Sequence, residues 1–298
     1  MKNVCICFIG SNETTKLLGT KETVSDLEFS HYTKEKITLT IVRPISFPEK
    51  IKTLIQAVNL SEYVVIEINE VNKYLGEVII LLESLGKKGE FIVPIEKQYL
   101  ISQVKELIKN TGLKDFNFRV ISDTEGIKKL KEELMKIEPV YGTNPLIIID
   151  HYFNVKNVGT VALGFIKGGL IRVKDKFTLL PGSKSIQINS MQSMDVDYKE
   201  LNLPARVGIS LKNCSINDLE RGAILTQTLN ETTELKGTLK KNKFHQEVIE
   251  KAMIINGLIA RQATFNEKII IEKPIVLTGK TIVYDDNKNP RIIGIIDQ

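Results

Sequence analysis

An abrupt change of pattern near residue 140 constrains the fold of this chain more than any other feature. Before that point, short apolar runs alternate with segments whose apolar residues recur at helical spacing. After it, short runs of alternating character are separated by turn residues such as Pro181 and Gly182, without helical periodicity. Residues 138–145, between the two regions, contain two prolines and a glycine and are typical of a linker. The sequence therefore predicts an α/β domain followed by a part built of strands.

Residues 1–137 are expected to form a doubly wound, mostly parallel sheet with helices on both faces, because predicted strands and helices alternate there. Ile51, Leu54 and Val58, for example, fall on one face of a helix. Strands are predicted at 4–10, 27–32, 37–42, 63–68, 91–95 and 116–121, and helices at 48–59, 71–85, 100–111 and 125–137. A loop is expected after the first strand, and the second and third strands are expected to pair as a hairpin.

The remainder is expected to form two β-barrels, one at 146–232 and a smaller one at 233–298. Strands of the smaller barrel are predicted at 248–255, 258–265, 268–271, 275–278, 280–284 and 291–296. A length of 298 residues agrees with two or three domains, since single domains usually contain about 100–200 residues.

Composition favours a soluble protein of the cytoplasm. The chain is 42% hydrophobic and 26% charged, which suffices for buried cores, and its net charge of +5 allows an anionic partner such as RNA without requiring one. Three cysteines are too few for a disulfide framework and fit a reducing compartment. We expect no signal peptide and no membrane span, because no apolar run reaches roughly 18 residues.

Short motifs in the second part carry a family resemblance. They are VKNVGTVALG at 155–164, GLIRVKD at 169–175, LPG at 180–182, SMQ at 190–192, RVG at 206–208 and LERGAIL at 219–225. This series resembles domain 2 of the EF-Tu/SelB-type translation elongation factors, whose barrel carries G-x-G-T-V-x-x-G, although Asn157 replaces the first glycine. Residues 233–298 are similar to a trimmed domain 3, through EKPI at 272–275 and IIG at 292–294. The chain is identified as a member of this family, similar to archaeal SelB-like factors, which implies that residues 1–137 correspond to the GTPase domain.

The resemblance places the phosphate-binding motif G-x-x-x-x-G-K-[ST] on residues 10–17. Gly10 and Lys16 match it, whereas Thr15 stands at the second glycine and Leu17 at the Ser/Thr. The second glycine lets backbone amides curl around a phosphate, and the hydroxyl binds Mg²⁺, so both functions are lost. We interpret Gly10, Thr15, Lys16 and Leu17 as the relic of a phosphate loop.

The other nucleotide motifs of the family are also altered. Arg43 replaces the magnesium-associated aspartate of D-x-P-G-H, where a cation repels Mg²⁺, and Ser46 and Phe47 replace its glycine and histidine. Of the guanine-reading motif N-K-x-D, only an acidic residue remains, Glu96. Ser122 lies in the position of the S-A-K motif. The segment before the second hairpin strand is also short for a full first switch. The sequence thus predicts no catalytic residue, no metal site and no cofactor, unless GTP and Mg²⁺ bind an unorthodox site.

The resemblance also implies contacts with tRNA. In the second part, Glu200 matches an acidic position of the family near the terminal adenosine of tRNA. Lys212 matches the family's basic position after V-G-x-x-[LS]. In the third part, a basic run matches the surface that contacts the T stem. The implied residues are Glu200, Lys212, Arg221, Lys240, Lys241 and Lys243. Two plainer interpretations stay open: Arg221 braces a turn of the barrel, and the lysines keep an edge strand soluble.

Three functions follow from these patterns. The leading hypothesis is an elongation factor-like protein that binds tRNA, aminoacyl-tRNA or the ribosome without GTP hydrolysis. The first alternative is a SelB-like GTPase with an unorthodox nucleotide site, and the second is a regulatory protein-interaction scaffold. Cys5 and Cys7, on the same side of a strand, are interpreted as small core residues because no histidine lies near them in the sequence.

Overall fold

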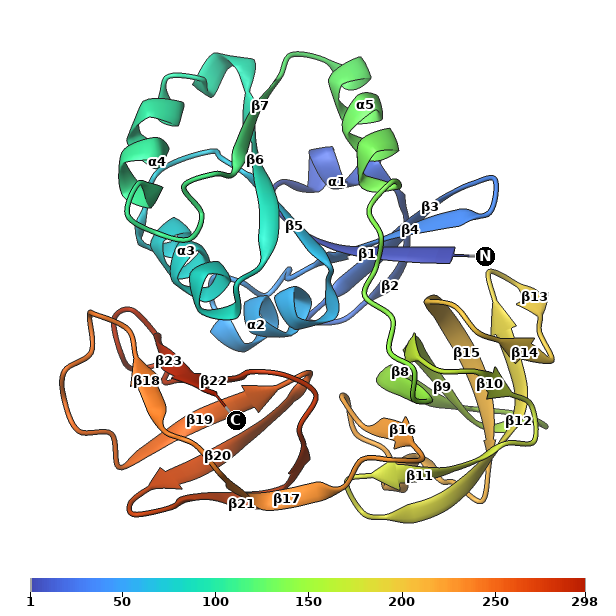
Figure 1. The fold of residues 1–298 in the computed structure, drawn as a ribbon. Helices are drawn as coiled ribbons and strands as arrows, with labels where there is room; N and C mark the ends of the chain where they lie inside the picture. The colour runs from blue at the N-terminus through green and yellow to red at the C-terminus, as the bar shows by residue number, and fades with distance from the viewer. Residues whose placement is uncertain (1, 298) are drawn as a thin grey trace.

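The computed structural model describes residues 2–297 and contains three large β-sheets (Figure 1). The first sheet has the strand order β2-β3-β4-β1-β5-β6-β7, in which β4, β1, β5, β6 and β7 run parallel. Its strands are β1 (Lys2–Ile9), β2 (Thr20–Val24), β3 (Glu28–Lys34), β4 (Ile37–Arg43), β5 (Tyr63–Glu67), β6 (Lys88–Pro94) and β7 (Asn117–Ile121). Its helices are α1 (Asn12–Leu18), α2 (Ile51–Leu60), α3 (Lys73–Leu85), α4 (Leu100–Ile108) and α5 (Thr124–Leu134). No helix within residues 2–297 combines the length and the apolar character that crossing a membrane requires.

Alternation along β1 explains why helices cover both faces of this sheet. Val4, Ile6 and Phe8 point to one face, where they are buried in a cluster with residues of α1 and α5. Cys5 and Cys7 point to the other face, in a cluster that includes residues of α2, α3 and α4. The predicted doubly wound arrangement is confirmed.

The sequence does not predict α1 or β2. The prediction of a loop after the first strand is wrong, because α1 and β2 follow β1. Helix α1 has seven residues, too few to show helical periodicity. It begins where the Ser11 hydroxyl accepts a hydrogen bond from the backbone N–H of Thr14 at 3.2 Å. Strand β2 pairs antiparallel with β3 and forms one edge of the sheet.

The second part forms a closed barrel, as predicted. Six strands follow one another in the order β11-β16-β8-β9-β15-β12, and pairing of β12 with β11 closes the ring. They are β8 (Leu146–Val155), β9 (Gly159–Gly168), β11 (Lys176–Leu180), β12 (Lys184–Ser193), β15 (Ala205–Lys212) and β16 (Ile224–Thr226). Short additions are β13 (Val196–Asp197), which pairs with β12, and a ribbon of β10 (Ile171–Arg172) and β14 (Glu200–Leu201). In the turn between β8 and β9, Asn157 has a φ of 67°, a left-handed conformation that asparagine adopts more readily than most residues, so it can replace a glycine.

The third part is an antiparallel sheet with the order β17-β21-β20-β19-β22-β23-β18, which curls into an open barrel with β17 and β18 at its edges (Figure 1). Its strands are β17 (Glu231–Leu235), β18 (Leu239–Lys241), β19 (Lys251–Asn256), β20 (Ile259–Phe265), β21 (Ile269–Val276), β22 (Thr281–Tyr284) and β23 (Ile292–Ile296). The two strands predicted at 268–271 and 275–278 form the single strand β21.

The three parts share one buried apolar cluster. Ile55 of α2, Phe165 of β9 and Leu258 of the third part all belong to it. A polar contact crosses the same junction, because Gln56 Nε2 donates a hydrogen bond to the carbonyl of Leu258 at 2.7 Å. The domain limits of 1–137, 138–145, 146–232 and 233–298 stay predictions.

Candidate functional site

The loop after β1 is held by a carboxylate from a neighbouring strand. Glu67, the last residue of β5, accepts hydrogen bonds from the backbone N–H of Ser11 at 2.5 Å and from the Thr14 hydroxyl at 2.8 Å. The space around Gly10 is equally tight, since a Cβ there would lie 2.6 Å from Glu67 Oε2. β1 and β5 are parallel neighbours, so their carboxyl ends meet at the edge where α/β sheets bind ligands. The carboxylate of Glu67 therefore lies at the N-terminus of α1.

The other positions of the relic loop differ from those of an anion-binding loop. Thr15 is buried, and its hydroxyl donates a hydrogen bond to the carbonyl of Ser11 at 2.8 Å. Lys16 is exposed, and within residues 2–297 its ammonium makes no hydrogen bond or ion pair. Leu17 exposes 46% of its surface. The interpretation of this segment as a relic stays a prediction, which nucleotide titration can test.

Arg43, at the position of the family's magnesium-associated aspartate, is paired with a buried carboxylate. Its Nε lies 3.1 Å from Glu28 Oε1, and its Nη2 donates hydrogen bonds to Glu28 Oε2 at 3.3 Å and to Asn12 Oδ1 at 3.2 Å. Glu28 is only 3% exposed. The pair fixes a guanidinium beside the first turn of α1, where it would repel a metal ion. In the described part of the chain, no three His, Cys, Asp or Glu side chains form a group able to hold a metal.

Of the two segments that would read a guanine base, one is exposed and the other caps a helix. Glu96 is exposed in a short 3₁₀ helix, η1 (Ile95–Lys97). Asp123, next to Ser122, accepts a hydrogen bond from the backbone N–H of Gly126 at 2.9 Å and thereby caps α5. Both carboxylates lie in loops after the carboxyl ends of β6 and β7.

The residues implied to contact tRNA in the second part lie in different surroundings. Glu200 is exposed on β14 and forms an ion pair with Arg172 of β10 at 3.1 Å. Lys212 is exposed at the end of β15. Arg221 is half-buried, and its Nη2 donates a hydrogen bond to the Ser25 hydroxyl of the first part at 2.7 Å. Arg221 thus joins two parts of the chain, and its contact with tRNA stays a prediction.

The implied lysines of the third part lie on β18, an edge strand, and just after it. Lys240 Nζ is 2.7 Å from the carboxylate of Asp297, and this hydrogen bond lowers the pKa of Asp297. Lys241 donates hydrogen bonds to two backbone carbonyls of the following loop. Lys243 Nζ lies 5.3 Å from the ring centre of the exposed Phe244. The RNA-binding and the edge-strand interpretations both stay open for this run.

Two buried charged contacts between the parts are not predicted from the sequence. Arg291 forms a forked ion pair with Glu77 of α3, with Nε–Oε1 and Nη2–Oε2 distances of 2.9 and 2.6 Å. Arg206 lies 4.4 Å from the ring centre of Phe29, and its Nη2 is 3.0 Å from Asp150 Oδ2. The available sequence signal is the carboxylate of Glu77 within a strongly apolar predicted helix, because such a group requires a partner when buried.

Thiol reactivity tests the burial of β1. Burial raises the pKa of the Cys5 thiol to about 12 and also raises those of Cys7 and Cys214, but Cys214 alone is only half-buried and can be reached by a reagent. We expect Ellman's reagent to modify one thiol per folded chain, that of Cys214, and three after denaturation, because the accessible thiolate is the reacting form. Rapid modification of a second thiol in the folded protein would contradict the placement of β1.

Comparison with known proteins gives several relatives, although no protein-family profile matches the chain. An uncharacterized protein of Methanocaldococcus jannaschii is 31% identical over 296 residues, which cover 94% of each chain. The selenocysteine-specific elongation factor of the same organism is 31% identical over 232 residues, which cover 71% of this chain and 48% of that protein. Elongation factor 1-alpha of Thermococcus onnurineus is 30% identical over 196 residues, covering 54% of this chain and 45% of that protein. The chain thus spans about half the length of these named relatives.

The fold is also that of a solved elongation factor. The structure of SelB from Methanococcus maripaludis, in complex with the GTP analogue GPPNHP, aligns with a TM-score of 0.83 and 18% identity. The alignment covers all of this chain and 79% of SelB. The order of an α/β sheet, a closed barrel and an open barrel agrees with this likeness. The chain belongs to the EF-Tu/SelB-type family of translation elongation factors.

Proposed function

We propose that this chain is an elongation factor-like protein that binds tRNA, aminoacyl-tRNA or the ribosome without hydrolysing GTP. The names of two relatives, selenocysteine-specific elongation factor and elongation factor 1-alpha, support a role in translation. We place this role in the cytoplasm, where ribosomes work. The barrels would make the RNA contacts, and the first domain would serve as a scaffold.

The contact of Glu67 with the head of α1 carries the part of the proposal that concerns GTP. A phosphate entering the loop would have to displace this carboxylate, or would be repelled by it. Leu17 offers no oxygen to magnesium, and Arg43, paired with Glu28, presents N–H donors where the family has a metal-associated carboxylate. Binding of GTP would therefore require rearrangement of α1 and of the end of β5.

A fluorescent GTP analogue titrated in the presence of Mg²⁺ tests this part. We expect no saturable signal up to about 100 μM, which corresponds to a binding free energy weaker than about −5.5 kcal/mol. The Lys16→Met variant is the matched comparison, because Lys16 is the matching cation of the motif. Saturable micromolar binding that this variant loses would favour the alternative of a GTPase with an unorthodox site.

Binding of aminoacyl-tRNA tests the other part. We expect the protein to protect the ester bond from hydrolysis and to retard tRNA in gels at low salt. Replacing Lys240, Lys241 and Lys243 by methionine is expected to reduce the slope of log affinity against log salt by about one for each phosphate that a lysine no longer neutralises. Replacing Lys128 and Lys129, exposed on α5, is the control. Absence of both protection and retardation would instead favour the scaffold alternative.

A further inference from the structure

Two adjoining cavities lie at the amino ends of β5 and β6, at the edge of the first sheet opposite to the relic loop. Their volumes are about 420 and 840 Å³, and Tyr63, Lys87 and Lys88 line both. The larger cavity is also lined by Lys167 from the second part and Leu258 from the third. It therefore lies where all three parts meet, and its size falls within the range of about 300–1,000 Å³ that is usual for small-molecule sites.

Both carboxylates that line the larger cavity already have partners. Glu62 Oε1 is 2.6 Å from Nζ of Lys167, and Glu62 Oε2 accepts a hydrogen bond from the backbone N–H of Cys5 at 2.8 Å. The carboxylate of Glu138 is 2.7 Å from Nζ of Lys2. The oxygens of both carboxylates are thus engaged, although the negative charge of Glu62 also raises the pKa of Lys87.

Two ammonium groups shared by the cavities have no carboxylate partner. Lys87 Nζ donates a hydrogen bond to the carbonyl of Ser61 at 2.5 Å, and no ion pair of Lys87 or Lys88 is found within residues 2–297. Burial lowers the pKa of Lys87, and the positive charge of Lys167 lowers it further. The charged form of Lys87 is thus held at a free-energy cost that a bound anion would offset.

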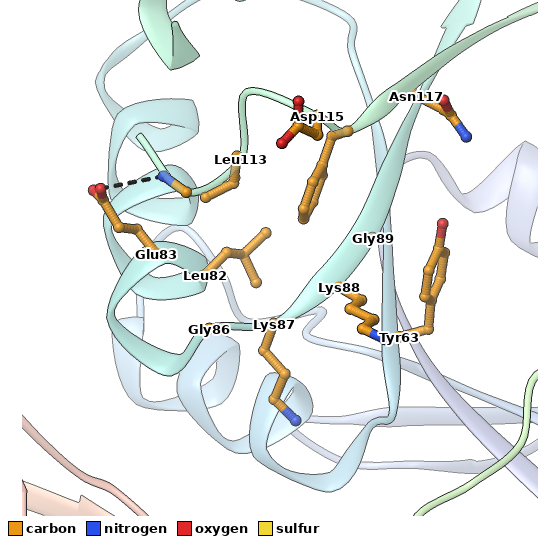
Figure 2. A pocket seen from close by; sticks show the side chains of 12 residues that line it. Tyr63, Leu82, Glu83, Gly86, Lys87, Lys88, Gly89, Leu113, Asp115 and Asn117 are labelled. Carbon is orange, nitrogen blue, oxygen red and sulfur yellow. Dashed lines mark hydrogen bonds between the residues drawn. The ribbon is translucent and has the colours of Figure 1, made fainter. Parts of the chain in front are cut away.

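The smaller cavity places apolar side chains beside these ammonium groups, and the exposed carboxylates of Glu83 and Asp115 also line it. Figure 2 shows Leu82 and Leu113 on one side of β6 and Tyr63 on the other, and Phe116 adds a half-buried ring. The Tyr63 hydroxyl makes no hydrogen bond in the described part of the chain. Burial raises the pKa of Tyr63 to about 12, so this group keeps its proton and can donate a hydrogen bond.

We propose that this junction binds a small phosphorylated molecule, with the phosphate held by Lys87 and Lys88 and the organic part against the wall of the smaller cavity. Ammonium groups suit phosphate as point charges, and apolar walls with a few polar groups are typical of small-molecule sites. Lys87 and Lys88 also line the larger cavity, which Lys167 and Leu258 border, so a phosphate held there lies beside the junction of the three parts. This inference goes beyond the proposed function, since it concerns the opposite edge of the sheet and involves no RNA.

Calorimetric titration of the full chain with adenosine 5′-monophosphate tests the site, with adenosine and inorganic phosphate as separate probes. We expect the monophosphate to bind with a Kd below about 1 mM, phosphate alone to bind more weakly, and adenosine not to bind. Lys87→Met and Lys88→Met are each expected to weaken monophosphate binding by about 10- to 100-fold, the effect of losing a hydrogen bond to a charged group. Lys16→Met, in the relic loop, is expected to leave it unchanged.

The outcomes separate this inference from the proposed function. Absence of binding by the monophosphate and by phosphate would overturn the inference, as would equal affinities in the wild type and in both cavity variants. Lys88 is exposed, so Lys88→Met tests the site even if Lys87→Met alters folding. Binding that only Lys16→Met abolishes would place the phosphate in the relic loop. That result would contradict the inference and also weaken the proposal of an inactive nucleotide site.

Discussion

Replacing Glu77 by alanine is expected to lower the free energy of unfolding by about 3–5 kcal/mol. Glu77 is 4% exposed and accepts three hydrogen bonds from Arg291, one of them from its backbone N–H. The Arg291 side chain is 12% exposed, and its guanidinium keeps its charge in the variant because arginine is not deprotonated at neutral pH even without a carboxylate partner. A buried charge without its counter-ion destabilises the protein by more than the intact pair contributes.

Urea unfolding of matched variants measures this effect. Glu83→Ala, at an exposed position of the same helix, loses only one long hydrogen bond from the backbone N–H of Gly112 at 3.4 Å and is expected to lower stability by no more than about 1 kcal/mol. The double replacement of Glu77 and Arg291 by methionine is expected to regain most of the loss, because an apolar pair of similar volume needs no counter-ion. An unfolding midpoint of Glu77→Ala equal to that of the wild type would show that the junction of α3 and β23 does not depend on this pair.

Replacing Glu67 by alanine is expected to cost about 2–3 kcal/mol and to make the protein responsive to small carboxylates. The variant loses two hydrogen bonds to a charged acceptor, from Ser11 and Thr14, each contributing about 1.5–3 kcal/mol when well shielded. Glu67 is half-buried, so the lower part of that range applies. Free formate is expected to occupy the vacated position and to restore part of the stability by mass action.

Thermal unfolding with increasing formate measures this rescue. The melting temperature of Glu67→Ala is expected to rise with formate, while that of the wild type stays constant relative to a chloride control of equal ionic strength. Glu67→Gln keeps one amide oxygen as acceptor. Its melting temperature is expected to lie between those of the wild type and Glu67→Ala. Equal responses of wild type and Glu67→Ala to formate would argue against a structural role of the carboxylate at the head of α1.

Local patterns predict most of the strands and helices of this fold. The alternation in β1 and the helical spacing in α2 are visible in the sequence because each buries a regular set of apolar side chains. α1 escapes prediction because seven residues are too few for a period, and β2 escapes because its sequence TKETV is polar and lies at a sheet edge.

Long-range polar contacts are the other part that sequence reasoning misses. Glu67 is 56 residues from Ser11, and Arg291 is 214 residues from Glu77, so no local pattern joins either pair. Substitutions in the phosphate motif indicate that the loop has changed, but they do not identify the carboxylate that lies against it. The lysine-lined cavities likewise depend on how three separately predicted parts pack together.

The position of Glu67 also has a consequence for cellular chemistry. A free nucleotide occupies its site according to its concentration, but a covalently attached side chain has a fixed effective concentration and cannot be diluted. In a chain that binds no nucleotide, as proposed, Ser11 and Thr14 keep Glu67 as their hydrogen-bond acceptor at every ratio of GTP to GDP. Under the proposed function, this end of the molecule would keep one conformation whatever the ratio of GTP to GDP in the cell.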